Sequence, residues 1–151
     1  MAILGFVDEF SSGGADMKHV LTVVGYVLAT FLTQGLSHFL IFKAHYDAMT
    51  FMAPEPNFAL GIASMLIQGT VLSLIYSWAR PNLPVAELPG AILIALMFGA
   101  FLVSYIGLAE AAKYAVPSTA AWIGVETAVG AVQFVLIGLI MGLAHARAKA
   151  A

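Results

Sequence analysis

Four long apolar runs constrain the fold of this chain more than any other feature of its sequence. They cover roughly residues 19–42, 58–78, 90–112 and 119–144. A transmembrane helix needs about 20 predominantly apolar residues, and each run is long enough. A helix satisfies its own backbone hydrogen bonds within lipid, whereas a hairpin of strands of this length does not. Because the connections between the runs are short, the sequence predicts an all-α integral membrane protein, a four-helix up-down bundle.

The composition excludes several classes of function. Of the 151 residues, 62% are hydrophobic and 9% are charged, whereas a soluble domain carries about 25% charged residues. The net charge of −2 provides no basic surface, so we expect no nucleic-acid partner. The sequence contains no cysteine, which excludes disulfides, thiolate nucleophiles and thiolate metal sites.

The sequence divides into three parts. Residues 1–17 form a head whose apolar side chains precede a Ser-Ser-Gly-Gly linker. This pattern suits a short interfacial helix, and a flexible N-terminus is the alternative. Residues 18–145 form the four-span transmembrane domain, and residues 146–151 form a short cytoplasmic tail.

Basic and aromatic residues indicate how the helices sit in the membrane, since cytoplasmic loops carry an excess of Lys and Arg. With four spans, one side of the membrane holds Lys18, Arg80, Arg147 and Lys149. The other side holds Lys43 and Lys113. This asymmetry predicts that both termini are cytoplasmic. Aromatic residues near the ends of the runs are expected to be interfacial anchors, namely Trp78, Trp122, Tyr26, Tyr46, Tyr76 and Tyr114.

Small residues indicate where the helices approach one another closely. Gly138 and Gly142 form a GxxxG pair in the fourth run, and Gly99 and Gly107 lie in the third. Helices in lipid associate through such small positions, because burial of apolar surface alone does not join them there. We expect these glycines to pack helices within one molecule, and a face for self-association is the alternative.

Polar residues inside the apolar runs are the candidates for a functional site. Where two occur in one run they are mostly four or seven residues apart, so they share a helix face. Buried polar side chains in lipid usually face the interior of the bundle. The candidates are Gln34, His38, Ser64, Gln68, Tyr105, Glu126 and Gln133.

The depth of these residues predicts two polar layers. With a rise of about 1.5 Å per residue, the three glutamines lie near the bilayer centre and form an amide layer. His38 and Glu126 lie in the non-cytoplasmic half and form an outer layer, with Ser64 and Tyr105 in the same half. His38 and Glu126 would be either a proton-accepting or ligand-orienting site in a pocket, or an interhelical hydrogen bond that fixes which helices are neighbours. For the glutamines, contacts between helices are the simpler interpretation.

We expect no metal, haem or other cofactor. His38, His45 and Asp47 have a spacing, H-x6-H-x-D, that suits a metal poorly. His19 and His145 are expected on the cytoplasmic side of the membrane, away from His38, so they do not form a haem site with it. The sequence offers no activated nucleophile, so no catalytic residue is assigned. Glu110 and Lys113, three residues apart, are expected to form an interfacial ion pair of structural value.

Three segments resemble a group of small bacterial four-helix integral membrane proteins of unknown function. They are HFLIFKAHYDAM, NFALGIASMLIQGTVLSLIY and SYIGLAEAAKYAVPSTAAWIGVETAVGAVQFVLIGLIMGLA. The resemblance implies four helices and no established activity, so it transfers no functional residues. With the distribution of basic residues, it predicts a multi-pass protein of the bacterial inner (cytoplasmic) membrane.

Three functions remain open. The first and preferred hypothesis is a non-catalytic accessory or structural subunit of a larger membrane complex, with membrane lipids and a protein complex or a second copy as partners. The second is a small binding or transport protein for a lipid-like or weakly polar ligand, built around His38, Glu126 and the glutamines. The third and weakest is an enzyme that uses His38 and Glu126 as acid and base.

Overall fold

The computed structural model describes the backbone of residues 13–53 and 55–150, and the side chains of residues 17–53 and 55–147. Within this part of the chain the secondary structure is helical, with no strand. The interfacial helix predicted within residues 1–17 lies mostly outside the described residues.

Four long helices follow one another along the chain. The first is α2 (Gly13–Leu36), continued by the π-helical turn η2 (Ser37–Ile41) and the short helix α3 (Lys43–Asp47). The second is α4 (Phe58–Ala79), followed by the 3₁₀ turn η3 (Arg80–Asn82). The third is α5 (Glu87–Ser104) with the π-helical turn η4 (Tyr105–Glu110), and the fourth is α6 (Thr119–Ala150).

Each of these helices contains a segment long and apolar enough to cross a membrane, namely Met17–Ile41, Phe58–Asn82, Glu87–Glu110 and Thr119–Arg147. The predicted all-α four-helix bundle is therefore confirmed. The last helix continues to Ala150, through most of the predicted tail, and a further short helix, α3, follows the first span.

Local sequence explains where the helices begin. The side chain of Asn57 accepts a hydrogen bond from the Leu60 amide at 3.2 Å and caps the start of α4. Ser118 Oγ accepts one from the Ala121 amide at 3.3 Å and caps the start of α6. Both side chains pair with amides of the first turn that have no partner inside the helix.

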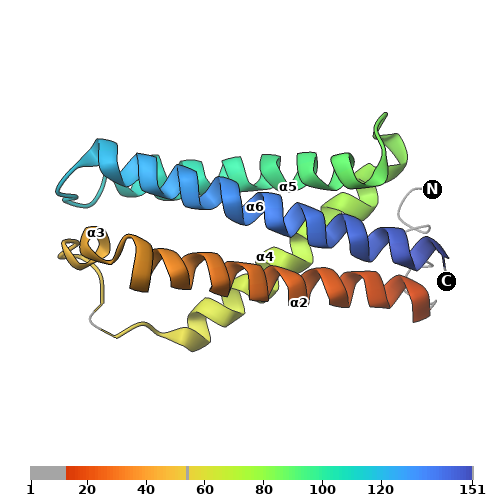
Figure 1. Cartoon of the computed structure of the whole chain (residues 1–151), viewed down its shortest axis with the longest axis horizontal. Helices are drawn as coiled ribbons and strands as arrows, with labels where there is room; N and C mark the ends of the chain where they lie inside the picture. The colour runs from red at the N-terminus through yellow and green to blue at the C-terminus, as the bar shows by residue number, and fades with distance from the viewer. Residues whose placement is uncertain (1–12, 54, 151) are drawn as a thin grey trace.

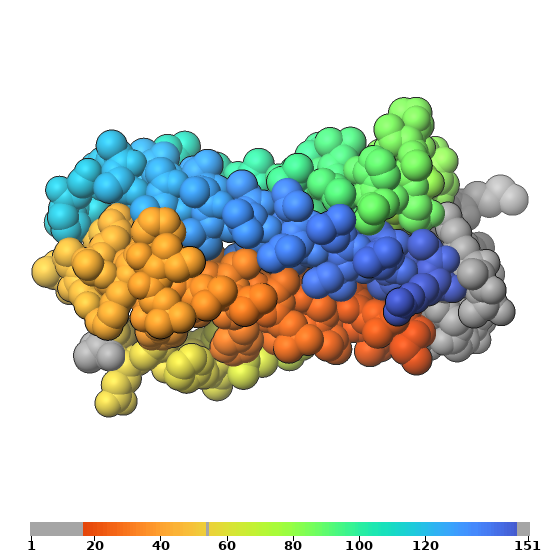
Figure 2. Space-filling view, in the orientation of Figure 1, coloured from red at the N-terminus to blue at the C-terminus, as the bar shows by residue number. Residues whose placement is uncertain are grey.

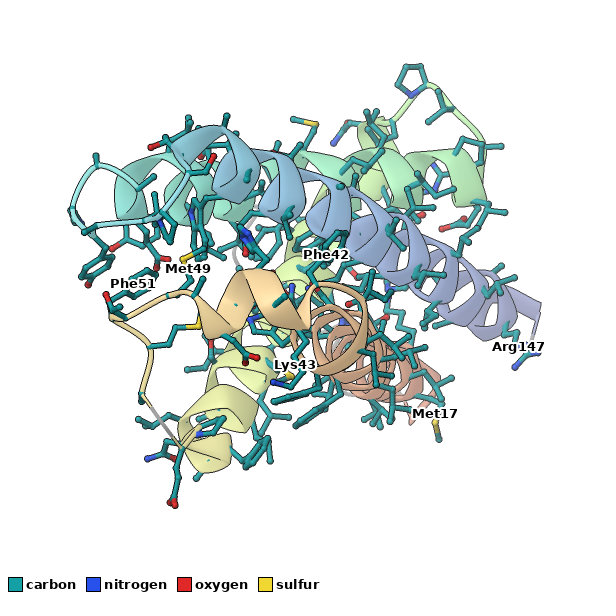
Figure 3. All side chains as sticks on the ribbon, turned by 60° about the vertical axis from the view of Figure 1, so that its left-hand side comes forward. Met17, Phe42, Lys43, Met49, Phe51 and Arg147 are labelled. Carbon is teal, nitrogen blue, oxygen red and sulfur yellow. The ribbon has the colours of Figure 1, made fainter. Side chains whose placement is uncertain are left out.

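The four helices run alternately up and down between two ends of the bundle (Figure 1). We call the end with α3 and the η4–α6 connection the α3 end, and the end with η3 the η3 end. Met17 and Arg147 lie together at the η3 end, whereas Phe42, Lys43 and Met49 lie at the α3 end (Figure 3). Lys43 and Arg147 thus lie at opposite ends of the bundle, as expected for four spans.

Helix α6 is the centre of the bundle and packs along both α2 and α5. Its surface runs beside that of α2 along one face of the molecule (Figure 2). In the most apolar 18-residue stretch of α6, 50% of the residues are buried inside the protein. In the corresponding stretch of α4 the share is 17%. The other helices of this molecule therefore leave most of α4 exposed.

Glycines allow the close approach of α5 and α6. A Cβ atom at Gly138 would lie 2.6 Å from Ile92 Cα, and one at Gly142 would lie 2.8 Å from Leu88 Cδ1. A Cβ at Gly99 would lie 2.4 Å from the Phe134 ring, whereas one at Gly107 would have no contact closer than 4.0 Å. Gly138, Gly142 and Gly99 thus face a neighbouring helix of the same molecule.

Helix α4 crosses the bundle obliquely (Figure 1). It packs against α2 and meets α5 at the η3 end. There the Tyr76 hydroxyl donates a hydrogen bond to Glu87 Oε1 at 2.8 Å, and Arg80 Nε lies 3.2 Å from the same oxygen. Toward the α3 end, α4 diverges from α5. This divergence opens space between the helices at the α3 end.

The aromatic residues do not all act as interfacial anchors. Trp78 and Tyr114 are exposed, as the sequence predicted. The prediction was wrong for Tyr26, Tyr46, Tyr76 and Trp122, all of which are buried. Each of these four has a polar tip that finds a hydrogen-bond partner inside the bundle, which permits burial.

Candidate functional site

The buried face of α2 is polar along its length. Thr22, Tyr26, Thr30, Thr33 and Ser37 follow one another at spacings of three or four residues, and each is buried. This spacing defines one face of a helix. Thr22 and Thr33 donate to carbonyl oxygens of their own helix, those of Lys18 and Ala29. Since polar groups in a membrane interior require partners, the other side chains depend on neighbouring elements.

Gln133 of α6 supplies partners in the middle of this face. Its Oε1 accepts a hydrogen bond from Gln34 Nε2 at 2.8 Å and lies 3.3 Å from Thr33 Oγ1, whose nearest acceptor is the Ala29 carbonyl oxygen at 2.8 Å. Its Nε2 donates to Thr30 Oγ1 at 3.1 Å. One glutamine thus joins α6 to three polar residues of α2.

Gln68 of α4 pairs separately from the other two glutamines. The Tyr26 hydroxyl donates to Gln68 Oε1 at 2.7 Å, and Gln68 Nε2 donates to Ser64 Oγ at 2.9 Å. The predicted amide layer is therefore two networks, one between α2 and α6 and one between α2 and α4.

Glu126 of α6 pairs with Tyr46 of α3. The Tyr46 hydroxyl donates to Glu126 Oε1 at 2.8 Å and accepts from Ser37 Oγ at 3.3 Å. Burial raises the pKa of Tyr46 above its ordinary value, so the hydroxyl keeps its proton and can donate. Among the described residues, none donates a hydrogen bond to the second carboxyl oxygen, Oε2 of Glu126.

These networks surround one cavity of about 250 Å³ between the four long helices. Its polar lining includes five of the seven candidates named from the sequence, Gln34, Ser64, Gln68, Glu126 and Gln133, together with Tyr26 and Thr30. Its apolar lining comes mainly from Met65, Leu102, Val103, Ile106 and Phe134. The cavity lies where α4 diverges from α5 and η4.

Two other cavities, of about 160 and 310 Å³, have almost wholly apolar linings. The first lies between α5 and α6, and the second between the α2–η2 segment and α6. Lipid chains can fill such surfaces without a specific partner. The polar cavity is therefore the candidate functional site.

His38 does not line this cavity and does not pair directly with Glu126. Its Nδ1 lies 3.0 Å from the Gln34 carbonyl oxygen, which can only accept, so Nδ1 carries the proton. Its ring stacks on the Tyr46 ring with centroids 3.6 Å apart. Tyr46 therefore stands between the two residues of the predicted outer layer.

Tyr105 and Lys113 also differ from the prediction. Tyr105 is 54% exposed on the outside of η4 and does not line the cavity. Lys113 Nζ lies 5.2 Å from the centroid of the Tyr105 ring. The ion pairs found in the described part of the chain do not include the predicted one between Glu110 and Lys113.

Sequence patterns indicated part of what the prediction missed. Thr22, Tyr26, Thr33 and Ser37 continue the face of α2 that contains Thr30, and their three- and four-residue spacing is visible in the sequence. Tyr46 gives no such signal, since it follows the span and reaches Glu126 only through the turn between η2 and α3.

No group of three or more His, Asp or Glu side chains among the described residues is placed to hold a metal ion. His19 and His145 meet at the η3 end with ring centroids 5.9 Å apart and the rings nearly perpendicular. This edge-on contact leaves no space for a haem between the two rings.

Comparison with known proteins found no matching family model, no similar curated protein and no similar solved structure. The resemblance to small bacterial membrane proteins stays a prediction, and the function must be argued from the cavity.

Proposed function

We propose that this protein is a non-catalytic membrane protein that binds a small, weakly polar or lipid-like molecule in the polar cavity. The observation that carries the proposal is that five polar candidates from three helices line a single cavity of about 250 Å³. A set of side chains that served only to join helices would fill the space between them. Here the same side chains surround an open volume at the α3 end.

The chemistry of the lining suits a ligand with both polar and apolar parts. Amides, hydroxyls and one carboxyl group line part of the wall, and the remainder is aliphatic or aromatic. Ligand cavities combine a mostly apolar wall with a few placed polar groups in this way. The divergence of α4 from α5 suits entry from the bilayer.

Catalysis is not part of the proposal. An acid–base pair must reach the same substrate proton, but the His38 ring stacks on Tyr46 and does not line the cavity. Glu126 is the one residue of the proposed pair that a ligand in the cavity would contact.

The preferred hypothesis from the sequence, an accessory subunit of a larger membrane complex, stays a prediction, as do the bacterial inner membrane and the cytoplasmic termini. The exposed apolar side chains of α4 suit lipid as well as a protein partner. The cavity favours the binding role, because an accessory subunit needs no polar space inside it.

Native mass spectrometry of the protein extracted gently from its own membrane tests the proposal. We expect a monomer or small oligomer that carries a reproducible small-molecule mass. The variant Gly61→Leu should lose that mass, since Gly61 lines the cavity and a Cβ there would meet only Met65 Cε, at 3.9 Å. This change fills the cavity without removing a hydrogen bond.

The matched control is Gly124→Leu, because Gly124 is exposed on α6 and a Cβ there would meet nothing within 4 Å. It should keep the bound mass. A larger assembly without a small molecule would instead favour the accessory subunit and contradict the binding role.

A further inference from the structure

The lining of the cavity contains one acidic side chain and no basic one. We propose that the ligand is a small organic cation, an amine with an apolar body, whose ammonium group pairs with Glu126. This inference rests on the proposed binding function and specifies the class of ligand for the same cavity.

Glu126 presents an acceptor to the cavity. Only 6% of the residue is exposed, Tyr46 donates to Oε1, and Oε2 receives no hydrogen bond from the described residues. The Oε1 atom of Gln34 likewise receives none, since Gln34 uses its Nε2 to reach Gln133. A primary ammonium group carries three donors and no acceptor, which matches a wall with unpaired acceptor oxygens.

The lining contains no positive counterpart for this carboxylate. No Lys, Arg or His is among the residues that line the cavity, and Glu126 is the one acidic residue there. A charged side chain within a membrane is costly unless it is paired. A ligand cation would supply the missing charge inside the cavity.

The aromatic and aliphatic wall suits the rest of such a ligand. Tyr26 and Phe134 contribute rings to the lining, and a cation near an aromatic face is attracted by it. The volume of about 250 Å³ exceeds the roughly 150 Å³ cavity that holds benzene in an engineered protein. A single-ring amine therefore fits.

Three probes of one ring size separate charge from shape. Benzylamine, benzyl alcohol and benzoate would be titrated at neutral pH into the full-length protein in lipid nanodiscs, with empty nanodiscs subtracted. We expect benzylamine to bind roughly tenfold or more tightly than benzyl alcohol, because hydrogen bonds to charged groups are the stronger ones. Benzoate should bind most weakly, since the cavity would then hold two like charges.

Glu126→Gln should abolish the preference for benzylamine and keep the binding of benzyl alcohol. Glu110→Gln, which changes an acidic residue of η4 that does not line the cavity, should keep the preference. The order of the affinities of the three probes for the unaltered protein tests the inference even if Glu126→Gln fails to fold.

The outcomes separate the two proposals. Equal binding of benzyl alcohol and benzylamine, or tighter binding of benzoate, would overturn the cation inference and leave the binding role standing. If no probe bound the unaltered protein more tightly than Gly61→Leu, the inference would be wrong, and the native mass measurement would decide the binding role separately.

Discussion

Tyr46 forms a hydrogen bond with Glu126, which lines the cavity. Tyr46→Phe removes the donor at 2.8 Å from Oε1 and leaves both carboxyl oxygens without a partner from the described residues. We expect a loss of about 1–3 kcal/mol in the free energy of unfolding, the cost of leaving a buried polar group unsatisfied. Reversible unfolding in mixed micelles, followed by tryptophan fluorescence, would measure the loss.

Tyr114→Phe is the matched control, since Tyr114 is exposed and its hydroxyl makes no hydrogen bond among the described residues. Its unfolding free energy should stay within about 0.5 kcal/mol of the unaltered protein. If the effects of Tyr46→Phe and Glu126→Leu, each of which removes the hydrogen bond, added without coupling in the double variant, the hydrogen bond would contribute nothing to stability.

At the residue scale, the sequence identified the glutamines and Glu126 as candidates because long apolar runs make each polar residue conspicuous, and all four line the cavity. The four-residue spacing of Ser64 and Gln68 placed both on the cavity side of α4. The partners of these residues were harder to predict. They depend on which side chains meet across helices, and a tyrosine near a span end can lie inside the bundle or at the interface.

The packing of α5 against α6 depends on two glycines of the GxxxG pair. Gly138→Ala would place a methyl group 2.6 Å from Ile92 Cα, a backbone atom that cannot move without separating the helices. We expect a loss of about 1–3 kcal/mol in the free energy of unfolding, typical of overpacking. The same unfolding measurement in mixed micelles would detect it.

Gly124→Ala, on the same helix, provides the comparison, because its methyl group would meet nothing within 4 Å. Alanine favours a helix over glycine by roughly 0.5–1 kcal/mol, so this variant should be neutral or slightly more stable. An equal loss in both variants would show that general sensitivity of α6, and not contact with α5, causes the effect.

At the element scale, the positions of the four helices were predictable, but the π-helical turns were not. Both turns, η2 and η4, lie at the α3 end of a long helix, and Ile106 of η4 lines the polar cavity. An extra residue in a turn changes which side chains face inward beyond it. Two wrong expectations fall on these turns, since Tyr105 begins η4 and is exposed, and His38 lies within η2 and stacks on Tyr46 instead of pairing with Glu126.

At the scale of the whole molecule, the oblique path of α4 creates the cavity. Short connections predicted an up-down bundle, but they did not specify that α4 would meet α5 only at the η3 end. The contacts of Arg80 and Tyr76 with Glu87 hold that end together. Among the described residues, no comparable polar contact joins α4 to η4, and α4 diverges from the α5–η4 segment there.

The orientation in the membrane is the last property that the charges predict. The sequence contains no cysteine, so single cysteines can be introduced without background. We expect Lys43→Cys and Lys113→Cys to react in intact cells with a maleimide that does not cross membranes, since both lie at the α3 end. Met17→Cys and Arg147→Cys lie at the η3 end, and should react only after the membrane is permeabilised.

All four positions are exposed on the protein, so a lack of reaction would report the membrane barrier and not burial. The reversed pattern would contradict the cytoplasmic termini and leave the bundle intact, because the two positions at each end would still behave alike. Reaction of Met17→Cys and Lys43→Cys from the same side of the membrane would contradict the four-span topology itself. It would mean that Met17–Ile41 does not cross the membrane, and the polar cavity, which that segment lines, would not lie within the bilayer.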